Sequence, residues 1–175
     1  CWGYDDFRGI QREIIDSICS GRDTLGLMPT GGGKSLTFQV PALSMQGVCL
    51  VITPLIALMK DQVQSLRRRG IKAAAVYSGM MHADVIATLE TAIFGGVKIL
   101  SSELFLKKFS HMKVSFVTVD EAHCISQWGY DFRPSYLKIS EIRRIKPDVP
   151  ILALTATATP RVVDDIQYRL GFKEK

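Results

Sequence analysis

The sequence lacks several features that would point to other classes of protein. Its four cysteines are widely scattered and none forms a C-x-x-C pair, so neither a zinc site nor a disulfide framework is expected. No apolar run reaches the ~18 residues that a membrane span needs. No basic segment followed by an apolar run marks a secretory signal at the N-terminus. Repeats, low-complexity tracts and linkers are also absent, which predicts a single domain over residues 1–175.

A large excess of charge of one sign is absent too. The 175 residues include 22 Lys and Arg and 17 Asp and Glu, for a net charge of +5. This charge is compatible with a polyanionic partner but does not require one. Apolar residues make up 47% of the chain, which is enough for a sizeable core. The chain begins at Cys1 rather than at Met, so we expect it to be a piece of a longer protein.

Short apolar runs alternate with amphipathic stretches along the whole chain. Helical spacing of apolar residues predicts helices at 7–20, 34–44 with an interruption near Pro41, 54–69, 83–94 with Gly95 and Gly96 as its end, 103–109, 136–145 and 161–170. Apolar runs predict strands at 24–28, 48–53, 73–77, 97–100, 114–119 and 151–154. Strands that are apolar on both faces and separated by helices predict an α/β fold, a mostly parallel sheet with helices on both faces. Ligands of such sheets bind at the carboxyl ends of the strands.

A glycine-rich loop follows the first expected strand. It reads Pro-Thr-Gly-Gly-Gly-Lys-Ser over residues 29–35, and Met28 stands where the pattern G-x-x-x-x-G-K-[ST] has its first Gly. The three glycines let the backbone fold tightly around phosphate, Lys34 can reach the β- and γ-phosphates, and Ser35 can bind magnesium. The loop therefore predicts a nucleotide site.

Two carboxylates follow the apolar run 114–119. Carboxylates next to a buried strand are costly unless they serve a function, and magnesium takes one or two carboxylates together with phosphate oxygens and waters. We expect Asp120 to bind the metal and Glu121 to polarise the attacking water. His123 has no second His or Cys at helical ligand spacing, and Cys124 directly follows it, so the two are not expected to share a metal.

The loop after Cys124 contains Gly129, ends at Pro134 and carries three aromatic residues and an arginine, namely Trp128, Tyr130, Phe132 and Arg133. Exposed aromatic rings of this kind stack on bases or on a sugar–phosphate chain. The alternative is that they pack back into the core. Their position directly after the carboxylates favours a loop that couples ligand binding to hydrolysis.

Three threonines follow the last expected strand. The hydroxyls of Thr155 and Thr157 can hydrogen-bond to the catalytic acids, and Thr159 is expected to cap the helix that begins near Pro160. We therefore expect this segment to lie at the same edge of the sheet as the two carboxylates.

Taken together, these motifs resemble the RecQ-type DNA helicases of superfamily 2 from about Trp2 to Thr159. The most specific part is the DEAH box, Asp120 to His123, joined to the aromatic-rich loop that ends at Pro134, because other branches of the superfamily lack this loop. The resemblance implies a RecA-like P-loop NTPase domain with ATP and Mg²⁺ as cofactors. It further implies ATP hydrolysis coupled to 3′-to-5′ unwinding of DNA in recombination and repair.

The resemblance also implies roles for individual residues at the nucleotide. The N-terminal segment is similar to an adenine-recognition motif in which an aromatic ring and Arg flank the base and Gln reads its edge. The nucleotide-binding residues are then Tyr4, Arg8, Gln11, Thr30, Gly31, Gly32, Gly33, Lys34 and Ser35. Catalytic roles fall to Lys34, Asp120, Glu121 and Gln127, and magnesium ligation to Ser35 and Asp120.

Contacts with single-stranded or duplex DNA are implied in the same way. Residues 51–63 resemble motif Ia, and residues 153–159 resemble motif III. The residues expected to contact nucleic acid are Thr53, Pro54, Trp128, Phe132 and Arg133, and those expected to couple the two activities are His123, Thr155 and Thr157.

Two positions depart from the family pattern. Tyr130 stands where the family usually has His, and we expect it to tune the coupling rather than to abolish it. After the run 97–100 the family usually carries an aromatic residue and then Ser/Thr-Pro-Glu-Arg-Leu, whereas this chain continues directly with Ser101-Ser102-Glu103. We expect the printed sequence to close over a missing segment, so that the Cα atoms of Leu100 and Ser101 lie clearly more than ~3.8 Å apart.

The chain carries one motor lobe only, so the expected partners are DNA and a second RecA-like domain of the same protein. Without that domain we expect the chain to hydrolyse ATP weakly or not at all. Three alternatives remain open: an RNA-remodelling ATPase of the same superfamily, a small-molecule P-loop kinase, and a nucleotide-binding module that is inactive without its second lobe. We expect a location at the nucleoid in the cytoplasm of a bacterium or in the nucleus of a eukaryote, without contact with a membrane.

Overall fold

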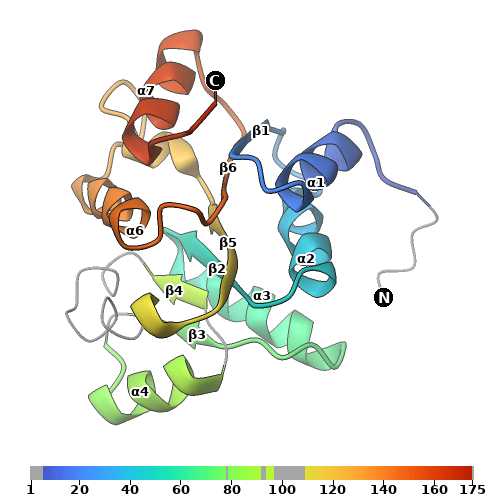
Figure 1. Cartoon of the computed structure of the whole chain (residues 1–175), viewed down its shortest axis with the longest axis vertical. Helices are drawn as coiled ribbons and strands as arrows, with labels where there is room; N and C mark the ends of the chain where they lie inside the picture. The colour runs from blue at the N-terminus through green and yellow to red at the C-terminus, as the bar shows by residue number, and fades with distance from the viewer. Residues whose placement is uncertain (1–5, 78, 92–93, 97–108, 175) are drawn as a thin grey trace.

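The centre of the structure is a six-stranded sheet with the strand order β1-β6-β5-β2-β4-β3. The computed structural model describes residues 6–77, 79–91, 94–96 and 109–174 (Figure 1). All strand pairs within these residues are parallel. The strands are β1 (Thr24–Leu27), β2 (Val48–Thr53), β3 (Ala75–Val76), β4 (Phe94–Gly96), β5 (Val114–Val119) and β6 (Ile151–Thr155). The predicted α/β fold with a parallel sheet is confirmed.

Helices connect the strands. The α-helices are α1 (Gln11–Cys19), α2 (Lys34–Ser44), α3 (Ile56–Arg68), α4 (His82–Thr91), α6 (Ser140–Ile145) and α7 (Pro160–Leu170). Two 3₁₀ helices, η2 (Ala122–Ile125) and η3 (Pro134–Ile139), follow β5. None of the helices in the described part of the chain is both long and apolar enough to span a membrane.

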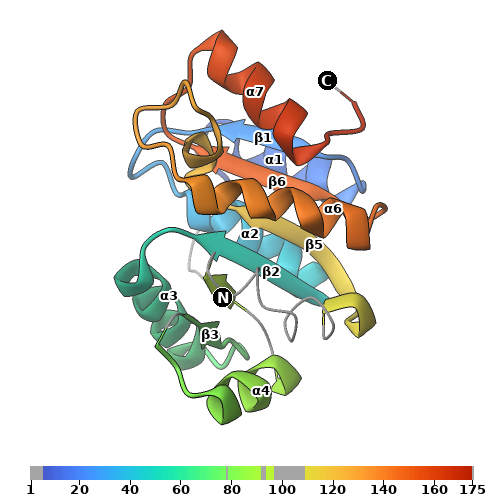
Figure 2. The ribbon, with the colours of Figure 1, turned by 90° about the vertical axis from the view of Figure 1, so that its left-hand side faces the viewer.

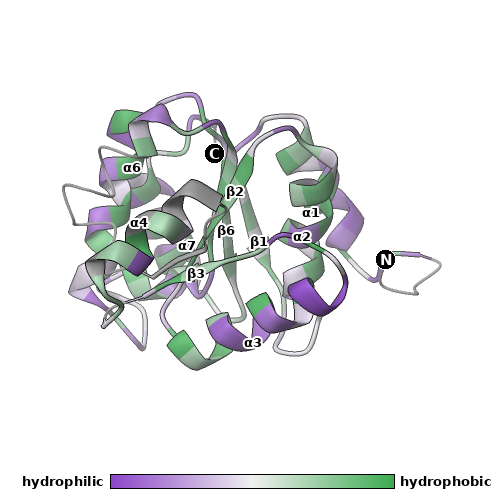
Figure 3. Cartoon of the chain, turned by 90° about the horizontal axis from the view of Figure 1, so that it is seen from below, coloured by the Kyte–Doolittle hydropathy of each residue, from purple (hydrophilic) through white to green (hydrophobic). Residues whose placement is uncertain are grey.

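Apolar residues of the helices cover both faces of the sheet. On one face, buried side chains of α1, α2 and α3 pack against Val51, Phe116 and Leu154 of the strands. On the other face, side chains of η2, η3, α6 and α7 pack against Leu50 and Val119. Figure 2 shows α6 and α7 in front of the sheet and α1 and α2 behind it, and Figure 3 shows hydrophobic strands between helices whose polar residues lie outward. Strands buried on both faces explain the continuous apolar runs of the sequence.

The region around residue 95 differs from the prediction. Helix α4 ends at Thr91, and Gly95 and Gly96, expected to end a helix, belong to β4 and pair with β2. Pairing on both sides, with β2 and with β3, outweighs the poor strand propensity of glycine here. The strand predicted at 97–100, the helix predicted at 103–109 apart from its last residue, and the Leu100–Ser101 junction lie outside the described residues.

Two helices also differ locally from the prediction. Helix α2 continues through Pro41, a buried residue, so the predicted interruption is wrong. The stretch predicted as one helix at 136–145 is the 3₁₀ helix η3 followed by α6. Pro134 at the first turn of η3 starts this segment earlier than the apolar spacing suggested.

The strand order brings three motifs to one edge of the sheet. Strand β6 lies between β1 and β5, so the segments that follow Leu27, Val119 and Thr155 are neighbours at the carboxyl ends of the strands. The backbone N–H of Met28 donates to the Thr155 carbonyl at 3.0 Å, which ties the first of these segments to the third. This edge is the place where a parallel sheet binds ligands.

Candidate functional site

The glycine loop leaves β1 and enters α2 with its backbone in the left-handed region at two positions. Gly31 has φ +80° and Gly33 has φ +78°, and only glycine adopts these angles without strain. Gly33 is the N-cap of α2, so the first backbone N–H groups of the helix lie open to an anion. Lys34 is the first residue of this helix, and Ser35, half-buried, is the second. The loop thus has the backbone geometry of a phosphate site.

Gln11 fixes the glycine loop through hydrogen bonds from its side chain to the backbone of the loop. Its side chain is buried, its Oε1 accepts a hydrogen bond from the Arg8 N–H at 2.8 Å, and its Nε2 donates to the Gly32 carbonyl at 3.0 Å and to the Gly33 carbonyl at 3.5 Å. Both ends of the Gln11 amide are thus engaged with backbone, and the adenine contact expected of Gln11 stays a prediction. Arg8 is exposed, and Tyr4 lies outside the described residues. Thr30 is exposed at the start of the loop.

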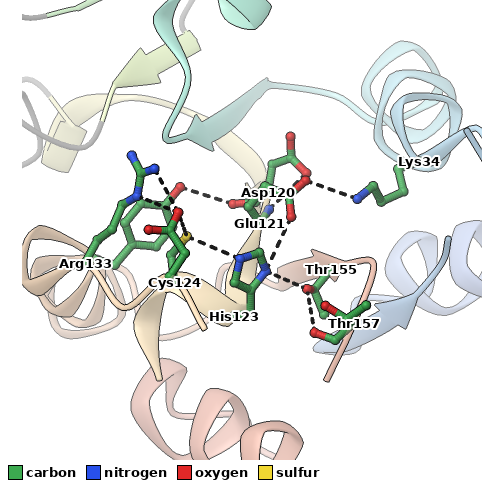
Figure 4. A network of polar contacts seen from close by, with 10 residues as sticks. Lys34, Asp120, Glu121, His123, Cys124, Arg133, Thr155 and Thr157 are labelled. Atoms are coloured by element: carbon green, nitrogen blue, oxygen red, sulfur yellow. Dashed lines mark hydrogen bonds and ion pairs between the residues drawn. The ribbon is translucent and has the colours of Figure 1, made fainter. Parts of the chain in front are cut away.

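The carboxylates at the end of β5 face this loop. Glu121 has φ +49° and ψ +48°, left-handed angles that are uncommon for a residue other than glycine. Its Oε1 lies 3.2 Å from Lys34 Nζ (Figure 4), and both side chains are mostly buried. Asp120 Oδ1 accepts a hydrogen bond from the Glu121 N–H at 3.0 Å, and the Asp120 N–H donates to the Ile52 carbonyl at 2.8 Å. The structure thus joins the two predicted motifs at one place.

The pKa of Asp120 is raised to about 6, first by burial and then by the negative charge of Glu121. Its ordinary pKa is 3.8, so between about pH 4 and pH 6 the folded protein binds more protons at this site than the unfolded chain does. The contribution of Asp120 to stability is therefore present below pH 4 and falls as the pH rises toward 6, by on the order of 2 kcal/mol.

Urea unfolding of the wild type and of Asp120→Asn at pH 4 and pH 6.5 measures this contribution of Asp120. We expect the wild type to lose more stability over this interval; an equal change in both proteins would contradict the assignment.

His123 connects the DEAH segment to the segment after β6. Its Nδ1 lies 2.9 Å from Thr155 Oγ1 and 3.4 Å from Glu121 Oε2, and Thr155 Oγ1 donates to the Thr157 carbonyl at 3.3 Å. Burial lowers the pKa of His123, which favours the neutral imidazole. The Tyr130 ring stacks on the imidazole with 4.3 Å between the ring centroids. His123 thus contacts Glu121, the segment that follows β6 and the aromatic-rich loop.

The threonine contacts correct one prediction. Thr155 was expected to bond to the catalytic acids, but its hydroxyl bonds to His123 instead. The parallel register of β5 and β6, with Val119 opposite Ala153, places Thr155 next to the segment that carries Glu121 and His123. Thr157 takes part through its backbone carbonyl. The cap predicted at Thr159 is confirmed, since its Oγ1 accepts a hydrogen bond from the Val162 N–H at 3.4 Å.

The aromatic-rich loop lies partly on the surface. Trp128 is 55% exposed and Tyr130 is 76% exposed, whereas Phe132 is half-buried. The guanidinium of Arg161, at the start of α7, lies 3.3 Å from the centroid of the Trp128 ring. The loop therefore presents an exposed Trp128 ring whose position the Arg161 guanidinium helps to fix. Gln127 is exposed, and its catalytic role stays a prediction.

Arg133 connects the aromatic-rich loop to the end of β2. Its Nη2 lies 2.8 Å from Asp131 Oδ2, and its Nη1 donates to the Pro54 carbonyl at 3.5 Å. Thr53 is buried, and its Oγ1 has no hydrogen-bond partner in the described part of the chain. In this conformation the Thr53 hydroxyl does not face solvent and is not accessible to nucleic acid. The contact expected of Thr53 stays a prediction.

Three residues of the network were missed by the sequence reasoning. Tyr136 is buried and donates from its hydroxyl to the Asp120 carbonyl at 3.2 Å; it was expected only as part of a core helix. Asp131 orients Arg133, and the Cys124 thiol donates to Asp131 Oδ2 at 3.7 Å. A tyrosine in an otherwise apolar helix face is the one available signal, since a buried hydroxyl usually needs a partner.

Replacing Tyr136 with Phe should destabilise the protein by about 1–2 kcal/mol, because the Asp120 carbonyl loses its hydrogen bond inside the core. The matched control is Tyr168→Phe, since Tyr168 is 79% exposed on α7 and should change stability by less than about 0.5 kcal/mol. The measurement is urea unfolding of both variants. Equal stabilities for the two would mean that the Tyr136 hydroxyl contributes nothing.

The donor set at this edge fits magnesium. Asp120 offers a buried carboxylate beside the open N-terminus of α2, and Ser35 offers a hydroxyl in the first turn of that helix. Magnesium prefers oxygen ligands and binds through one or two carboxylates together with phosphate oxygens. Asp120 and Ser35 are the residues that would hold the ion.

Comparison with known proteins gives matches over nearly the whole chain. A model of the DEAD/DEAH box helicase family matches residues 8–166. A probable ATP-dependent DNA helicase RecS of Bacillus subtilis is 41% identical over 97% of this chain and 35% of its own length. The ATP-dependent DNA helicase RecQ of Pasteurella multocida is 44% identical over 98% of this chain and 28% of its own length. The chain thus spans about a third of these curated relatives.

A solved structure supports the fold. The Hef helicase domain of Pyrococcus furiosus superposes with a TM-score of 0.75 at 22% identity and covers 95% of this chain and 37% of that one. At this level of identity the likeness concerns the fold alone.

Proposed function

The chain belongs to the DEAD/DEAH box helicase family, and from this premise we propose that it is the ATP-binding motor lobe of a RecQ-type DNA helicase. The observation that carries the proposal is the convergence of Lys34 and Glu121, 3.2 Å apart, at the carboxyl edge of the sheet. A cation at a helix N-terminus facing a carboxylate is the arrangement that phosphoryl transfer from a nucleotide needs.

The backbone N–H groups of the glycine loop and the first turn of α2 would hold the β- and γ-phosphates, with Lys34 neutralising their charge. Bound magnesium would supply further charge neutralisation at the phosphates, held by Asp120 and Ser35. Glu121 would accept the proton of the attacking water, and His123, 3.4 Å from Glu121 Oε2, would orient that carboxylate. When nucleotide is bound, Lys34 leaves Glu121 for phosphate and the carboxylate is set free for this role.

DNA would reach this chemistry through the aromatic-rich loop. Tyr130 stacks on His123, which in turn contacts Glu121 and Thr155, so movement of the loop bears directly on the carboxylate. Trp128 offers an exposed ring for stacking on bases. Arg133 would add a positive charge for the phosphate backbone. Tyr130, with its ring on His123, would set how strongly the two events are coupled.

The activity of the whole protein is part of the proposal. A second RecA-like domain would complete the ATP site, and 3′-to-5′ unwinding in recombination and repair would follow, at the nucleoid of a bacterium or in the nucleus of a eukaryote. The test is strand separation by the full-length protein on duplexes with either a 3′ or a 5′ single-stranded tail. ATP-dependent separation of the 3′-tailed duplex alone is expected. Separation of RNA duplexes only would favour an RNA-remodelling ATPase, and no separation would favour a nucleotide-binding module.

Replacing Trp128 with Ala should lower the stimulation of ATP hydrolysis by single-stranded DNA at least several-fold, because one stacked base contributes about 1–3 kcal/mol. Hydrolysis without DNA should stay within twofold of the wild type, since Trp128 is not among the described residues that contact Asp120 or Glu121. The assay is steady-state hydrolysis by the full-length protein at increasing DNA concentration. Tyr168→Ala, which removes another exposed ring, is the matched control. Equal stimulation in both variants would exclude a DNA contact at Trp128.

A further inference from the structure

Three potential metal ligands converge at the end of the DEAH box, and of these only His123 takes part in the proposed ATP chemistry, through its Nδ1 side. One donor atom each from His123, Cys124 and Asp131 lies within 4.8 Å of the other two. Cys124 Sγ is 3.7 Å from His123 Nε2 and 3.7 Å from Asp131 Oδ2. In a tetrahedral zinc site with ordinary bond lengths, a sulfur and a nitrogen or oxygen ligand lie roughly 3.6 Å apart. The spacing around the thiol therefore already matches that of a tetrahedral site.

The imidazole of His123 is oriented for such a site. Thr155 Oγ1 uses its proton on the Thr157 carbonyl, so it accepts a hydrogen bond from His123 Nδ1. The proton of the neutral ring is then on Nδ1, and the lone pair of Nε2 faces the Cys124 thiol. A histidine that ligates a metal through one nitrogen commonly donates its other N–H in this way.

The carboxylate of Asp131 is held in place as well. Arg133 donates to its Oδ2 from both Nε and Nη2, at 3.1 and 2.8 Å, and so acts as an outer partner that orients the carboxylate. A thiolate and a carboxylate together with a neutral imidazole carry two negative charges, which a divalent cation balances.

We propose that His123 Nε2, Cys124 Sγ and the Asp131 carboxylate form a binding site for a thiophilic divalent cation such as Zn²⁺. The fourth ligand would be a water molecule, as in zinc sites that have three protein ligands. Binding converts the thiol to a thiolate and releases its proton to solvent. Magnesium prefers oxygen ligands and would not compete here, so this site is separate from the one expected at Asp120.

The proposal departs from an expectation of the sequence analysis. His123 and Cys124 adjoin in the chain and were not expected to share a metal, and no C-x-x-C pair announced a site. The 3₁₀ helix η2 makes the sharing possible, because its tight turn brings Cys124 Sγ to the Nε2 side of the His123 ring. A bound cation would link η2 to Asp131 in the aromatic-rich loop. It would thereby fix the position of that loop relative to η2.

The test is a titration of the protein with Co²⁺, a spectroscopic substitute for Zn²⁺, in a buffer that contains excess Mg²⁺. We expect one Co²⁺ per chain with a thiolate-to-cobalt charge-transfer band, displaced by Zn²⁺. Cys124→Ser should abolish the band, and Asp131→Asn should weaken binding at least tenfold. Cys49→Ser is the matched control, since Cys49 lies on β2 with its thiol 3.8 Å from Thr118 Oγ1 and outside the cluster.

Two results would overturn the proposal. The first is the absence of a charge-transfer band in the wild type. The second is a band that survives in Cys124→Ser, which would assign the thiolate to another cysteine. Because Cys124 is fully buried and its replacement can affect folding, Asp131→Asn gives an independent answer: Asp131 is partly exposed, and unchanged affinity in this variant would exclude its carboxylate from the site.

Discussion

Replacing Glu121 with Gln is expected to lower ATP hydrolysis by the full-length protein on the order of 10²–10⁴-fold. Glutamine keeps the shape of the side chain but cannot accept the proton of the attacking water. It also removes the ion pair that holds Lys34 at 3.2 Å, so nucleotide should bind at least as tightly as in the wild type. The measurements are steady-state hydrolysis and the equilibrium binding of a fluorescent ATP analogue.

The matched control for this experiment is Glu141→Gln, in the first turn of α6. It makes the same change of charge away from the nucleotide and should hydrolyse ATP within twofold of the wild type. If Glu121→Gln retained substantial hydrolysis, the general base would have to be another residue. If it lost nucleotide binding as well, Glu121 would serve the structure of the site rather than the chemical step.

Replacing Lys34 with Ala is expected to lower hydrolysis on the order of 10²–10³-fold and, unlike Glu121→Gln, to weaken nucleotide binding too. Lys34 begins α2 beside the open backbone N–H groups, where its ammonium group would neutralise the β- and γ-phosphates. The same two assays apply. The opposite binding behaviour of the two variants separates the residue that holds the phosphates from the residue that activates water.

Two control variants sharpen the Lys34 experiment. Lys138→Ala removes an exposed lysine of η3 and should leave both hydrolysis and binding unchanged. Lys34→Arg keeps the charge but replaces a compact ammonium by a planar guanidinium, so it should recover part of the binding and little of the hydrolysis. Wild-type nucleotide affinity in Lys34→Ala would contradict the phosphate site that the glycine loop predicts.

The sequence predicted the parts of the fold that depend on local pattern. The apolar run 114–119 is β5, and the glycine loop begins where β1 ends, because strands buried on both faces leave a continuous apolar signal. The edge shared by Lys34 and Asp120 also followed from local pattern, since both motifs come directly after strands of one parallel sheet.

Other features depend on contacts between distant segments and left no local signal. Gly95 and Gly96 are typical of a helix end, yet they form part of β4 because β2 pairs with both and β3 pairs with Gly95. The hold of Gln11 on the glycine loop joins residues more than 20 positions apart. The bond between His123 and Thr155 follows from the register of β5 and β6, which no single segment encodes.

The central claim, that this chain is the ATP-binding lobe of a DNA-coupled motor, is tested most directly by one comparison. The rate of ATP hydrolysis by the full-length protein is measured at saturating ATP and Mg²⁺, with and without single-stranded DNA. The account predicts a low rate alone and a strong increase with DNA, because the aromatic-rich loop connects through Tyr130 and His123 to Glu121. A rate that is the same with and without DNA would contradict it.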